Sequence, residues 1–394
     1  MACLWPAQAL AAIPNGHTKD PLARSVLLSL GSIYRVETTV SVTALRTNNG
    51  TGKTYPLGRI HTVTLLGTAF AVAPTGVLVT DAHVAAPFGA PLAVAAAPLA
   101  LAQIGEFGQE TAYLAWVDAN KVVPVGVHVV GLRVWRATAD PKVHGTQIPA
   151  RIVDGSIEQH ADLALLQLSD PNVPALLLND GSETLETPIA SIGYGVETAT
   201  TLGLPTTLVP DVKFGQIGPT STKPIAAAPG QTVTYISTPI ARGDSGGPAI
   251  DQSAQVYGIV RFEYLSGGVL EQSQSIADLL GRMHVKNANG PVFDDFKRGM
   301  NDLWSGNYAG AEIAFADTLT ADPTHPLAAQ EQLLAARLAH AKPAAGRPAW
   351  WRILFVGVAV IAALAALGCV WRLRKLGRIR NGQDDAAPQL PPAQ

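Results

Sequence analysis

Short β-branched runs, each bounded by glycine, proline, asparagine or aspartate, recur along the chain from about Ser25 to Val285. They include SIYRVETTVSV, TVTLLGTAFAV, GVLVTDAHV, VGVHVVGLRVW, ADLALLQL, TPIASIGYG, QTVTYISTPI and QVYGIVRFEY. Many short strands with turn residues between them are typical of an all-β barrel or sandwich. The pattern therefore predicts a mainly β domain over residues 25–285.

Two stretches inside this region depart from the strand pattern. The Ala-, Pro- and Leu-rich segment between Ala85 and Val123 is interpreted as an insertion. The stretch NNGTGKT, residues 48–54, resembles a phosphate-binding loop, but the first glycine of that motif would fall on Thr47. Because no strand-then-helix context surrounds it, we expect a hairpin turn there.

The character of the sequence changes after Asn287, where apolar residues recur at three- and four-residue spacing. This spacing predicts helices, and residues 295–341 resemble one tetratricopeptide repeat followed by the start of another helix. The resemblance rests on Gly306, Asn307, Tyr308, Ala311, Phe315, Leu319, Asp322 and Pro323.

One such repeat cannot bury its own apolar face, so it must pack on the β domain, on another copy or on a partner. The alternative is a plain helical hairpin that acts as a spacer. We expect Tyr308, Phe315 and Leu319 to pack inward, and a separate module whose deletion leaves the β domain folded.

Residues 353–371 read ILFVGVAVIAALAALGCVW, a run without charge that is long enough to span the hydrocarbon core of a bilayer. The flanking residues Trp350, Trp351 and Trp371 resemble interfacial anchors. We predict one transmembrane helix here, followed by a basic and then disordered tail over residues 372–394.

Basic residues near this helix predict its orientation. Five follow it closely: Arg372, Arg374, Lys375, Arg378 and Arg380. Four more widely spaced ones precede it: Arg337, Lys342, Arg347 and Arg352. The denser cluster favours a cytoplasmic tail and a β domain on the periplasmic or extracellular side. The rival is a tail-anchored protein with its β domain in the cytosol.

Residues 1–24 begin with MACLWPAQALAA, which is apolar and ends in small residues, like the end of a secretory signal. It lacks the basic start of such a signal. A remnant signal segment and an unstructured leader both remain open.

Composition limits the partners. The formal net charge of −2 and the pI near 6.5 argue against nucleic acid, because phosphate binding needs a basic surface. Cys3 and Cys369 are the only cysteines, and neither lies in the β region. No disulfide framework is therefore available there.

The stretch TPIARGDSGGPAID, residues 238–251, places Ser245 in a glycine-rich turn. A serine nucleophile needs a base and an acid that orients the base. His83 follows the apolar run Val77–Thr80, and Asp162 opens the apolar run ADLALLQL. A carboxylate there can accept the proton on one ring nitrogen of His83 and leave the other nitrogen free for the Ser245 proton.

Taken in this order, the motifs resemble those of the trypsin-like (chymotrypsin-fold) serine peptidases, particularly the bacterial Deg/HtrA-like branch. The resemblance covers most of residues 25–285 and rests on GTAFAV and VTDAHV, ADLALL, NDGSETLETPIASIGYG, GDSGGPAID and VYGIV. It implies two six-stranded β-barrels, with the triad His83, Asp162 and Ser245 in the cleft between them.

The resemblance implies roles for further residues. The N–H groups of Gly243 and Ser245 would form the oxyanion hole. Pro239, six residues before Ser245, falls at a position that helps to form the primary specificity pocket in the family. A proline there provides no acidic group to bind a substrate Lys or Arg. The substrate-pairing strand would carry Arg261, Phe262 and Glu263, where small residues are more usual, so that these side chains could narrow the cleft.

The sequence also departs from the family. Ala69 stands where a second glycine is usual, and the helical segment and membrane helix stand where Deg/HtrA-like proteins usually carry a PDZ domain. No Ile-Val-Gly-Gly start follows a basic residue, so activation by chain cleavage is unsupported. Asp244 therefore needs another partner, either Arg242 or a backbone donor.

Other candidate residues fit the chemistry less well. The remaining histidines of the β region lack the small-residue context of His83 and are interpreted as surface or packing residues: His61, His128, His144 and His160. Asp154 precedes Gly155 and is typical of a turn. No histidine pair has metal-binding spacing, so we expect neither a catalytic metal nor a cofactor.

We therefore expect a membrane-anchored serine endopeptidase that hydrolyses peptide bonds in protein substrates through an acyl-enzyme intermediate. The alternative is a catalytically silent protease fold that serves as a binding or scaffold protein, with a protein partner on the helical segment. The three intact triad residue types favour the enzyme. The large side chains on the substrate-pairing strand, Arg261, Phe262 and Glu263, favour the alternative.

Overall fold

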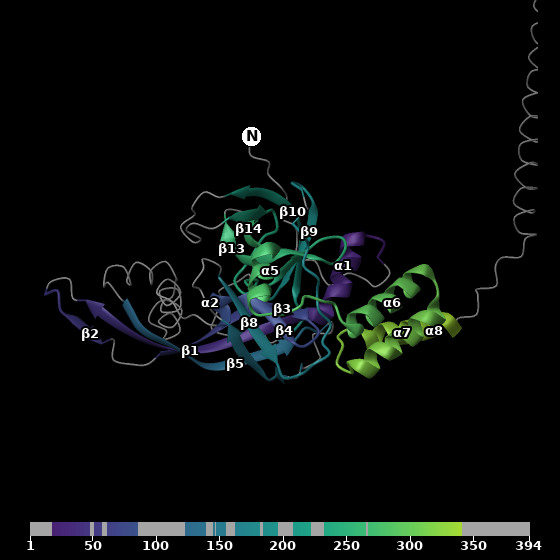
Figure 1. Cartoon of the computed structure of the whole chain (residues 1–394), viewed down its shortest axis with the longest axis horizontal. Coiled ribbons are helices and arrows are strands. Elements are labelled where there is room, and N and C mark those ends of the chain that lie inside the picture. The colour runs from purple at the N-terminus through teal and green to yellow at the C-terminus, as the bar shows by residue number, and fades with distance from the viewer. Residues whose placement is uncertain are drawn as a thin grey trace, which may run out of the picture. The chain divides into compact units, whose positions relative to one another are not determined.

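Strands are the most frequent elements in the part of the chain that the computed structural model describes (Figure 1). The described residues are 18–47, 51–56, 61–85, 123–138, 145, 147–154, 162–181, 184–195, 208–221, 232–264 and 267–340. Most of the predicted insertion, the membrane helix 353–371 and the tail 372–394 lie outside them, as does most of the leader. None of the described helices is both long and apolar enough to cross a bilayer.

The strands fall into two antiparallel sheets. Those of the first are β1 (Ile33–Thr47), β2 (Thr54–Pro56), β3 (His61–Ala73), β4 (Val77–Asp81), β5 (Val123–Arg136), β6 (Gln147–Ile148), β7 (Ala150–Asp154) and β8 (Leu163–Leu168). Those of the second are β9 (Pro188–Gly193), β10 (Asp211–Ser221), β11 (Val233–Ile236), β12 (Pro248–Ile250), β13 (Val256–Tyr264) and β14 (Gly267–Gln272).

Helices flank the sheets and follow them. They are α1 (Pro21–Ser29), the short 3₁₀ turn η1 (Leu30–Ser32), α2 (Ala82–Ala85), α5 (Ser273–Arg282), α6 (Pro291–Ser305), α7 (Tyr308–Ala321) and α8 (Ala328–His340). The mainly β prediction for residues 25–285 and the helical prediction after Asn287 are both confirmed by this order of elements.

The first sheet runs in the order β6-β5-β1-β3-β4-β8-β7, with β2 paired to β1. Its two edge strands, β6 and β7, are separated in the chain by Pro149 alone, so the sheet curls round into a barrel. It has eight strands and not the expected six. The additional strands are short: Pro149 interrupts one edge because it has no N–H to donate, and β2 pairs only with the far end of β1.

The second sheet is a closed barrel of six strands in the order β10-β11-β14-β13-β12-β9, as expected. Apolar side chains that alternate along these strands fill its interior. The core cluster comprises Ile189, Ile217, Ile236, Ile240, Ala249, Tyr257, Val260 and Leu270.

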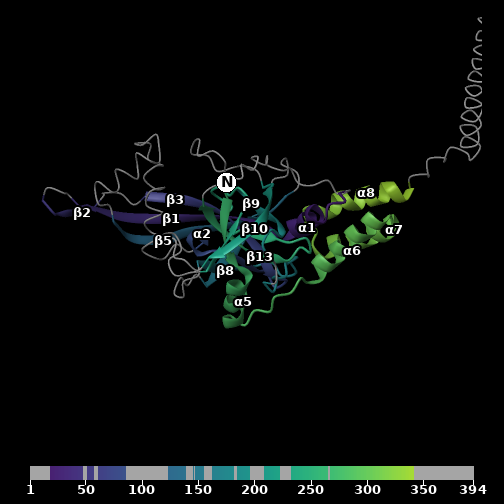
Figure 2. The same cartoon turned by 90° about the horizontal axis from the view of Figure 1, so that it is seen from above.

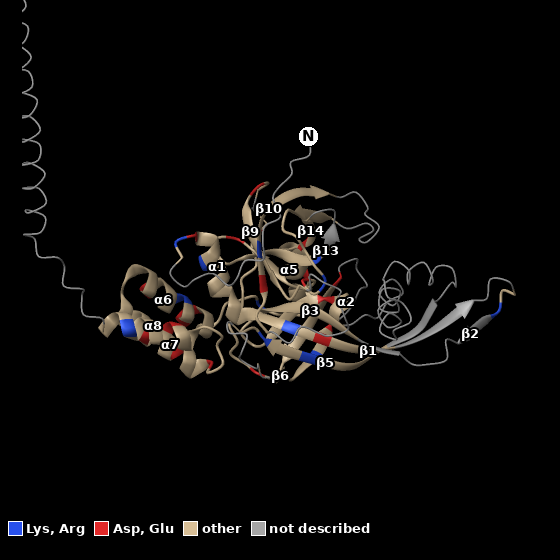
Figure 3. Ribbon diagram, turned by 180° about the vertical axis from the view of Figure 1, so that it is seen from behind, with Lys and Arg blue, Asp and Glu red and all other residues tan. Residues whose placement is uncertain are grey.

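Strands β1, β3 and β5 are much longer than an average strand and extend past the first barrel (Figure 1). Thr47 of β1 pairs antiparallel with Thr54 of β2, so the stretch that resembled a phosphate loop connects a hairpin, as predicted. Figure 3 shows basic and acidic residues interspersed over the sheet. Arg35 and Arg133, for example, both pair with Glu37.

Helices α6, α7 and α8 lie together, and α6 contacts α1 (Figure 2). Phe315 of α7 is fully buried against Phe296 of α6, with ring centroids 5.7 Å apart. Gly299 makes this approach possible, since a Cβ there would lie 2.6 Å from the Phe315 ring. Tyr308 and Leu319, which were also expected to pack inward, are half-buried.

The helices are attached to the first barrel through buried polar contacts. Arg136 at the end of β5 forms a buried ion pair with Asp322, which follows α7, and donates a hydrogen bond to Thr324 at 3.0 Å. Arg24 of α1 lies 4.4 Å from the Trp304 ring of α6. The described residues up to Ala336 form one compact unit, and the separate helical module whose deletion leaves the β domain folded stays a prediction. Sequence spacing did not reveal the Arg136–Asp322 pair because its partners are far apart in the chain.

Candidate active site

The pairing of β4 with β8 brings His83 and Asp162 together. Asp81, the last residue of β4, pairs with Leu163, the first residue of β8. His83 lies just beyond Asp81 on the single turn of α2, and Asp162 lies just before Leu163. The backbone N–H of Ala82 donates to the Asp162 carbonyl at 3.1 Å, which extends the strand pairing to the site itself.

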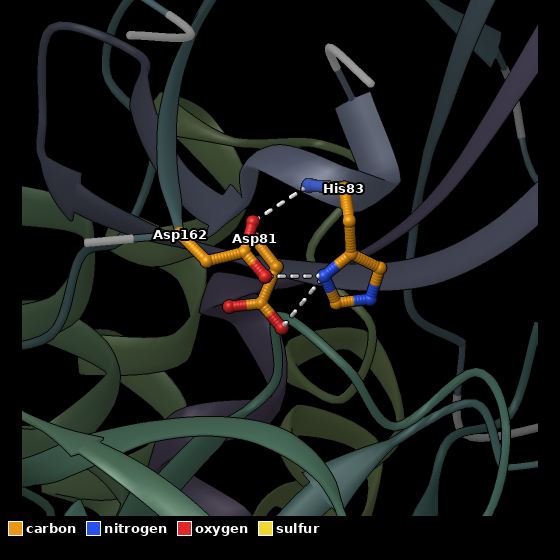
Figure 4. A group of neighbouring side chains, drawn as sticks. All are labelled: Asp81, His83 and Asp162. Atoms are coloured by element: carbon orange, nitrogen blue, oxygen red, sulfur yellow. Dashed lines mark hydrogen bonds and ion pairs between the residues drawn. The ribbon is translucent and has the colours of Figure 1, made fainter. Parts of the chain in front are cut away.

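The Asp162 carboxylate holds His83 at two points (Figure 4). Its Oδ2 lies 2.6 Å from the ring Nδ1 of His83, and its Oδ1 accepts the backbone N–H of His83 at 2.8 Å. These contacts fix the ring orientation and the tautomer, with the proton on Nδ1. The other ring nitrogen, Nε2, is then the basic atom.

The charges of this pair shift both pKa values. Burial alone would lower the pKa of His83, but the negative charge of Asp162 and its hydrogen bond outweigh burial and raise that pKa above its usual 6.5. Burial alone would raise the pKa of Asp162, but His83 and then Arg261 hold it far below its usual range. Asp162 is therefore ionised at neutral pH and supports positive charge on His83.

Ser245 lies in a turn that only glycine permits at two positions. Gly243 and Gly246 have φ values of +97° and +85°. A Cβ on Gly243 would lie 2.2 Å from the Tyr194 carbonyl oxygen, and one on Gly246 would lie 2.1 Å from that of Thr68. The glycines of GDSGGP are therefore required by the backbone path around the serine.

The same turn leaves two backbone donors available. Within the described residues, the N–H groups of Gly243 and Ser245 donate to no acceptor, whereas that of Gly246 donates to Val260 and that of Gly247 to Asp244, both at 2.8 Å. Unused N–H groups beside a serine are what an oxyanion hole requires.

Thr68 of β3 joins the first barrel to this turn. Its N–H donates to the Ser245 carbonyl at 2.9 Å, and its hydroxyl donates to the Gly243 carbonyl at 2.8 Å. The same hydroxyl accepts the N–H of Tyr194 at 3.0 Å. Thr68 therefore fixes the position of the turn relative to the barrel that carries His83.

The Ser245 hydroxyl donates a hydrogen bond to the backbone carbonyl of Arg261 at 2.7 Å. Among the described residues the structure gives no hydrogen bond between Ser245 and His83. The serine is thus present in the site with its hydroxyl directed at the neighbouring strand, and rotation about its Cα–Cβ bond is needed to redirect it.

Asp244 has a partner that the sequence did not suggest. Lys213 of β10 forms a buried ion pair with its Oδ2, which also accepts the N–H of Ala241 at 2.8 Å. Arg242, which we had considered as the partner, is exposed, whereas the expected backbone donor is Ala241. No sequence motif marks Lys213, because it is separated from Asp244 by a complete hairpin of the second barrel.

The predicted substrate-binding residues belong to two segments of the second barrel: Pro239 lies between β11 and β12, and the other three lie on β13. Pro239 is exposed just before the turn, and Phe262 is half-buried and packs against Val233 and Val269. Glu263 lies on β13, but its side chain is outside the described part. The Arg261 guanidinium is buried against Asp162, so it does not narrow a cleft, while the Arg261 carbonyl faces Ser245.

Asp81 is a site residue that sequence reasoning missed, although it stands two residues before His83. It is fully buried, and among the described residues neither carboxylate oxygen has a hydrogen-bond partner. Its Oδ2 lies 3.9 Å from His83 Nδ1 (Figure 4). Burial raises the pKa of Asp81 well above its usual value, and His83 opposes this shift.

The polar atoms of Asp81, His83 and Asp162 lie within 4.8 Å of one another. Three such groups can in principle hold a metal ion. Here the contact between His83 and Asp162 and the adjacent Arg261 cation explain the cluster without an ion, so we assign none to it.

The competing candidates lie elsewhere. Asp154 ends β7 opposite Leu165, and His128 is exposed on β5 opposite Ser41. His61 begins β3, with its side chain outside the described part. His144 and His160 are likewise outside the described residues.

The central part of the chain matches a known protein family. Residues 67–259 match the family model of the trypsin-like peptidase domain, a span that contains His83, Asp162 and Ser245. No curated protein sequence matches the chain.

Two solved structures illustrate the structural similarity. The crystal structure of the Rv3671c protease from M. tuberculosis in its active form is 16% identical, covers 73% of this chain and 97% of that chain, and has a TM-score of 0.41. The HtrA-type protease AlgW with a decapeptide is 15% identical, covers 67% of each chain, and has a TM-score of 0.43.

Proposed function

We propose, on the premise that residues 67–259 form a trypsin-like peptidase domain, that this protein is a serine endopeptidase acting on protein substrates. The observation that carries the proposal is the attachment of His83 to Asp162 by two hydrogen bonds, beside a turn that presents Ser245 and two unused N–H groups. Base, orienting acid, nucleophile and oxyanion donors are the parts that acyl transfer requires.

The proposed mechanism assigns one step to each group. Ser245 Oγ attacks the scissile carbonyl carbon and passes its proton to His83 Nε2, while Asp162 stabilises the resulting imidazolium. The negative oxygen of the tetrahedral intermediate binds the N–H groups of Gly243 and Ser245. His83 then protonates the leaving amine, and water, activated by His83, hydrolyses the acyl-enzyme.

A second candidate is a catalytically silent protease fold that binds a protein partner through α6–α8. The observation in its favour is the hydrogen bond from Ser245 to the Arg261 carbonyl in place of one to His83. Catalytic hydrogen bonds are often loose or absent without substrate, so the two candidates differ in whether the Ser245 hydroxyl turns toward His83 when substrate binds.

Covalent labelling with a fluorophosphonate probe tests the enzyme against the silent fold. We expect the full-length protein to be labelled at Ser245 and to cleave an unfolded protein such as casein. Ser245→Ala should abolish labelling and lower turnover by about 10⁶. Ser253→Ala, which changes an exposed turn serine, is the matched control and should react like the wild type. A folded wild-type protein that neither reacts nor cleaves would establish the silent fold instead.

The role of Asp162 is tested separately. Asp162→Asn should fold but lose about 10⁴ in turnover, because an amide stabilises the wrong imidazole tautomer. Wild-type rates in this variant would move the orienting role to another acid, with Asp154 the next residue to change.

We further propose that residues 353–371 anchor the enzyme in a membrane, with the peptidase domain outside and the tail in the cytoplasm. The charge-free run and the dense basic cluster after it support this orientation. Reporters fused to Gln394 decide the topology. A fluorescent protein that matures only in the cytosol should be fluorescent, and a phosphatase that is active only outside the cytosol should show no activity. The reverse pattern would place the peptidase domain in the cytosol.

A further inference from the structure

Arg261 contacts two groups of the proposed triad from one position on β13. Its guanidinium Nη2 lies 3.2 Å from Asp162 Oδ2, and its backbone carbonyl accepts the Ser245 hydroxyl at 2.7 Å. Asp162 belongs to the first barrel and Arg261 to the second. The Arg261–Asp162 ion pair therefore joins the two barrels at the point where the chemistry is proposed to occur.

A β-bulge gives Arg261 this double contact. The β13–β14 register shifts between Val260 and Phe262, so that Arg261 is the extra residue of the pairing. A bulge re-aims the side chain that it carries. The Arg261 guanidinium is consequently buried, with only 4% of its side chain exposed, and is directed toward Asp162.

A second carboxylate pairs with the other terminal nitrogen of the guanidinium. Glu271 of β14 lies 3.3 Å from Arg261 Nη1 and accepts a short hydrogen bond from the Ser275 hydroxyl of α5. A buried chain of contacts thus runs from α5 through Glu271, Arg261 and Asp162 to His83. Both terminal nitrogens of the Arg261 guanidinium have a carboxylate partner, which fixes a long side chain that would otherwise be mobile.

The charges around His83 set how tightly its ring holds a proton. Asp162 and Asp81 are the acidic groups that favour the protonated ring, and Arg261 is the cation that opposes it. Glu271 pairs with the same Arg261 guanidinium, through its other terminal nitrogen. Because the site is largely withdrawn from water, a fixed cation 3.2 Å from the orienting carboxylate acts with little screening.

We infer that Arg261 is a positioning residue of the proposed peptidase, which orients Asp162 and makes His83 hold its proton less tightly than it would with Asp162 and Asp81 alone. The inference rests on the proposed function for its consequence in catalysis. It replaces the substrate-contact role that the sequence suggested for the Arg261 side chain.

The test compares the pH dependence of Arg261 variants. Arg261→Gln should shift the acid limb of kcat/KM to higher pH, because the repulsion that favours neutral His83 is gone. Arg261→Lys keeps a charge without the two-sided fork, so its midpoint should lie between those of Arg261→Gln and the wild type. A role confined to stability would lower the rate equally at every pH and leave the midpoint in place, which would overturn the inference.

Two further variants keep the test decisive. If Arg261→Gln leaves Glu271 unpaired and the protein does not fold, Arg261→Gln/Glu271→Gln removes both charges together and should show the same upward shift. Arg136→Gln removes an equally buried guanidinium that pairs with Asp322 away from His83, and its midpoint should equal that of the wild type.

A readout that does not need activity separates this inference from the proposed function. The titration of the His83 ring can be followed by NMR in Ser245→Ala protein, with and without Arg261→Gln. An upward shift of the His83 midpoint supports the inference even if the wild type proves unreactive toward fluorophosphonate. Identical His83 midpoints would refute it even if the wild type is an active peptidase.

Discussion

Lys213 forms a buried ion pair with Asp244, the residue that immediately precedes the proposed nucleophile Ser245. Asp244 also accepts the N–H of Ala241, so the ion pair stabilises the turn that contains Ser245. In this protein the cation comes from within the second barrel, on β10. The turn therefore needs no new chain end, and thus no cleavage, to be held in place.

The first prediction concerns Lys213→Met. The unpaired Asp244 should cost about 3–5 kcal/mol of unfolding free energy, as for other broken buried pairs. Loss of the oxyanion donors should lower turnover by about 10²–10³. Chemical denaturation and peptide hydrolysis measure the two effects. The double variant Lys213→Met/Asp244→Asn should recover much of the stability, and full activity in Lys213→Met alone would show that the pair is not needed for the turn.

The second prediction concerns pH. His83 must be neutral to accept a proton, and its pKa in the folded protein is raised above the usual 6.5, chiefly by Asp162 acting against burial. Activity should thus be complete above that raised pKa and fall as the solution is acidified through it. The profile of kcat/KM between pH 5 and 9 measures the midpoint, with circular dichroism as a control for unfolding. Undiminished rates down to pH 4.5 would exclude His83 as the base.

The third prediction concerns specificity. Pro239 provides no acidic group, and the buried Ile240 beside it contacts Gly268, where a Cβ would lie 2.3 Å from Ile240 Cγ1. Cleavage should follow small or apolar residues. A peptide library in which the residue before the scissile bond is varied measures this preference. A peptide library dominated by Lys or Arg would contradict this account of the pocket.

The fourth prediction concerns α6–α8. Asp322→Ala leaves Arg136 buried without its anion and should cost about 3–5 kcal/mol of unfolding free energy. Deleting residues 291–340 should destabilise the barrels as well, contrary to what the sequence suggested. Thermal unfolding of both variants measures this. Asp317→Ala removes an exposed carboxylate that pairs with Arg298, and should change stability by less than about 1 kcal/mol. A deletion variant as stable as the full chain would show that α6–α8 form a separate module.

Local sequence patterns were sufficient for the strands and for the proximity of His83 and Asp162. Both residues lie at the ends of apolar runs, and antiparallel pairing of neighbouring strands brings such ends together. The glycines of GDSGGP were also informative, because a positive φ leaves few residues to choose from.

Contacts between residues far apart in the chain were not predictable in the same way. Lys213, Arg261 and Asp322 each form a buried ion pair whose partner no spacing rule connects to it. The direction of the Arg261 side chain depends on one bulge in β13, whose position no motif that we used in the sequence marks. Asp81 was overlooked because an aspartate at a strand end is ordinarily a turn residue.

Thr68 has a consequence for the order of events during synthesis. His83 and Asp162 are translated and can pair before the second barrel leaves the ribosome. The turn around Ser245 acquires its position only when Thr68 of the first barrel donates to the Ser245 and Gly243 carbonyls. A nascent chain therefore carries the proposed base before it carries a positioned nucleophile, and the proposed hydrolysis needs the second barrel to be complete.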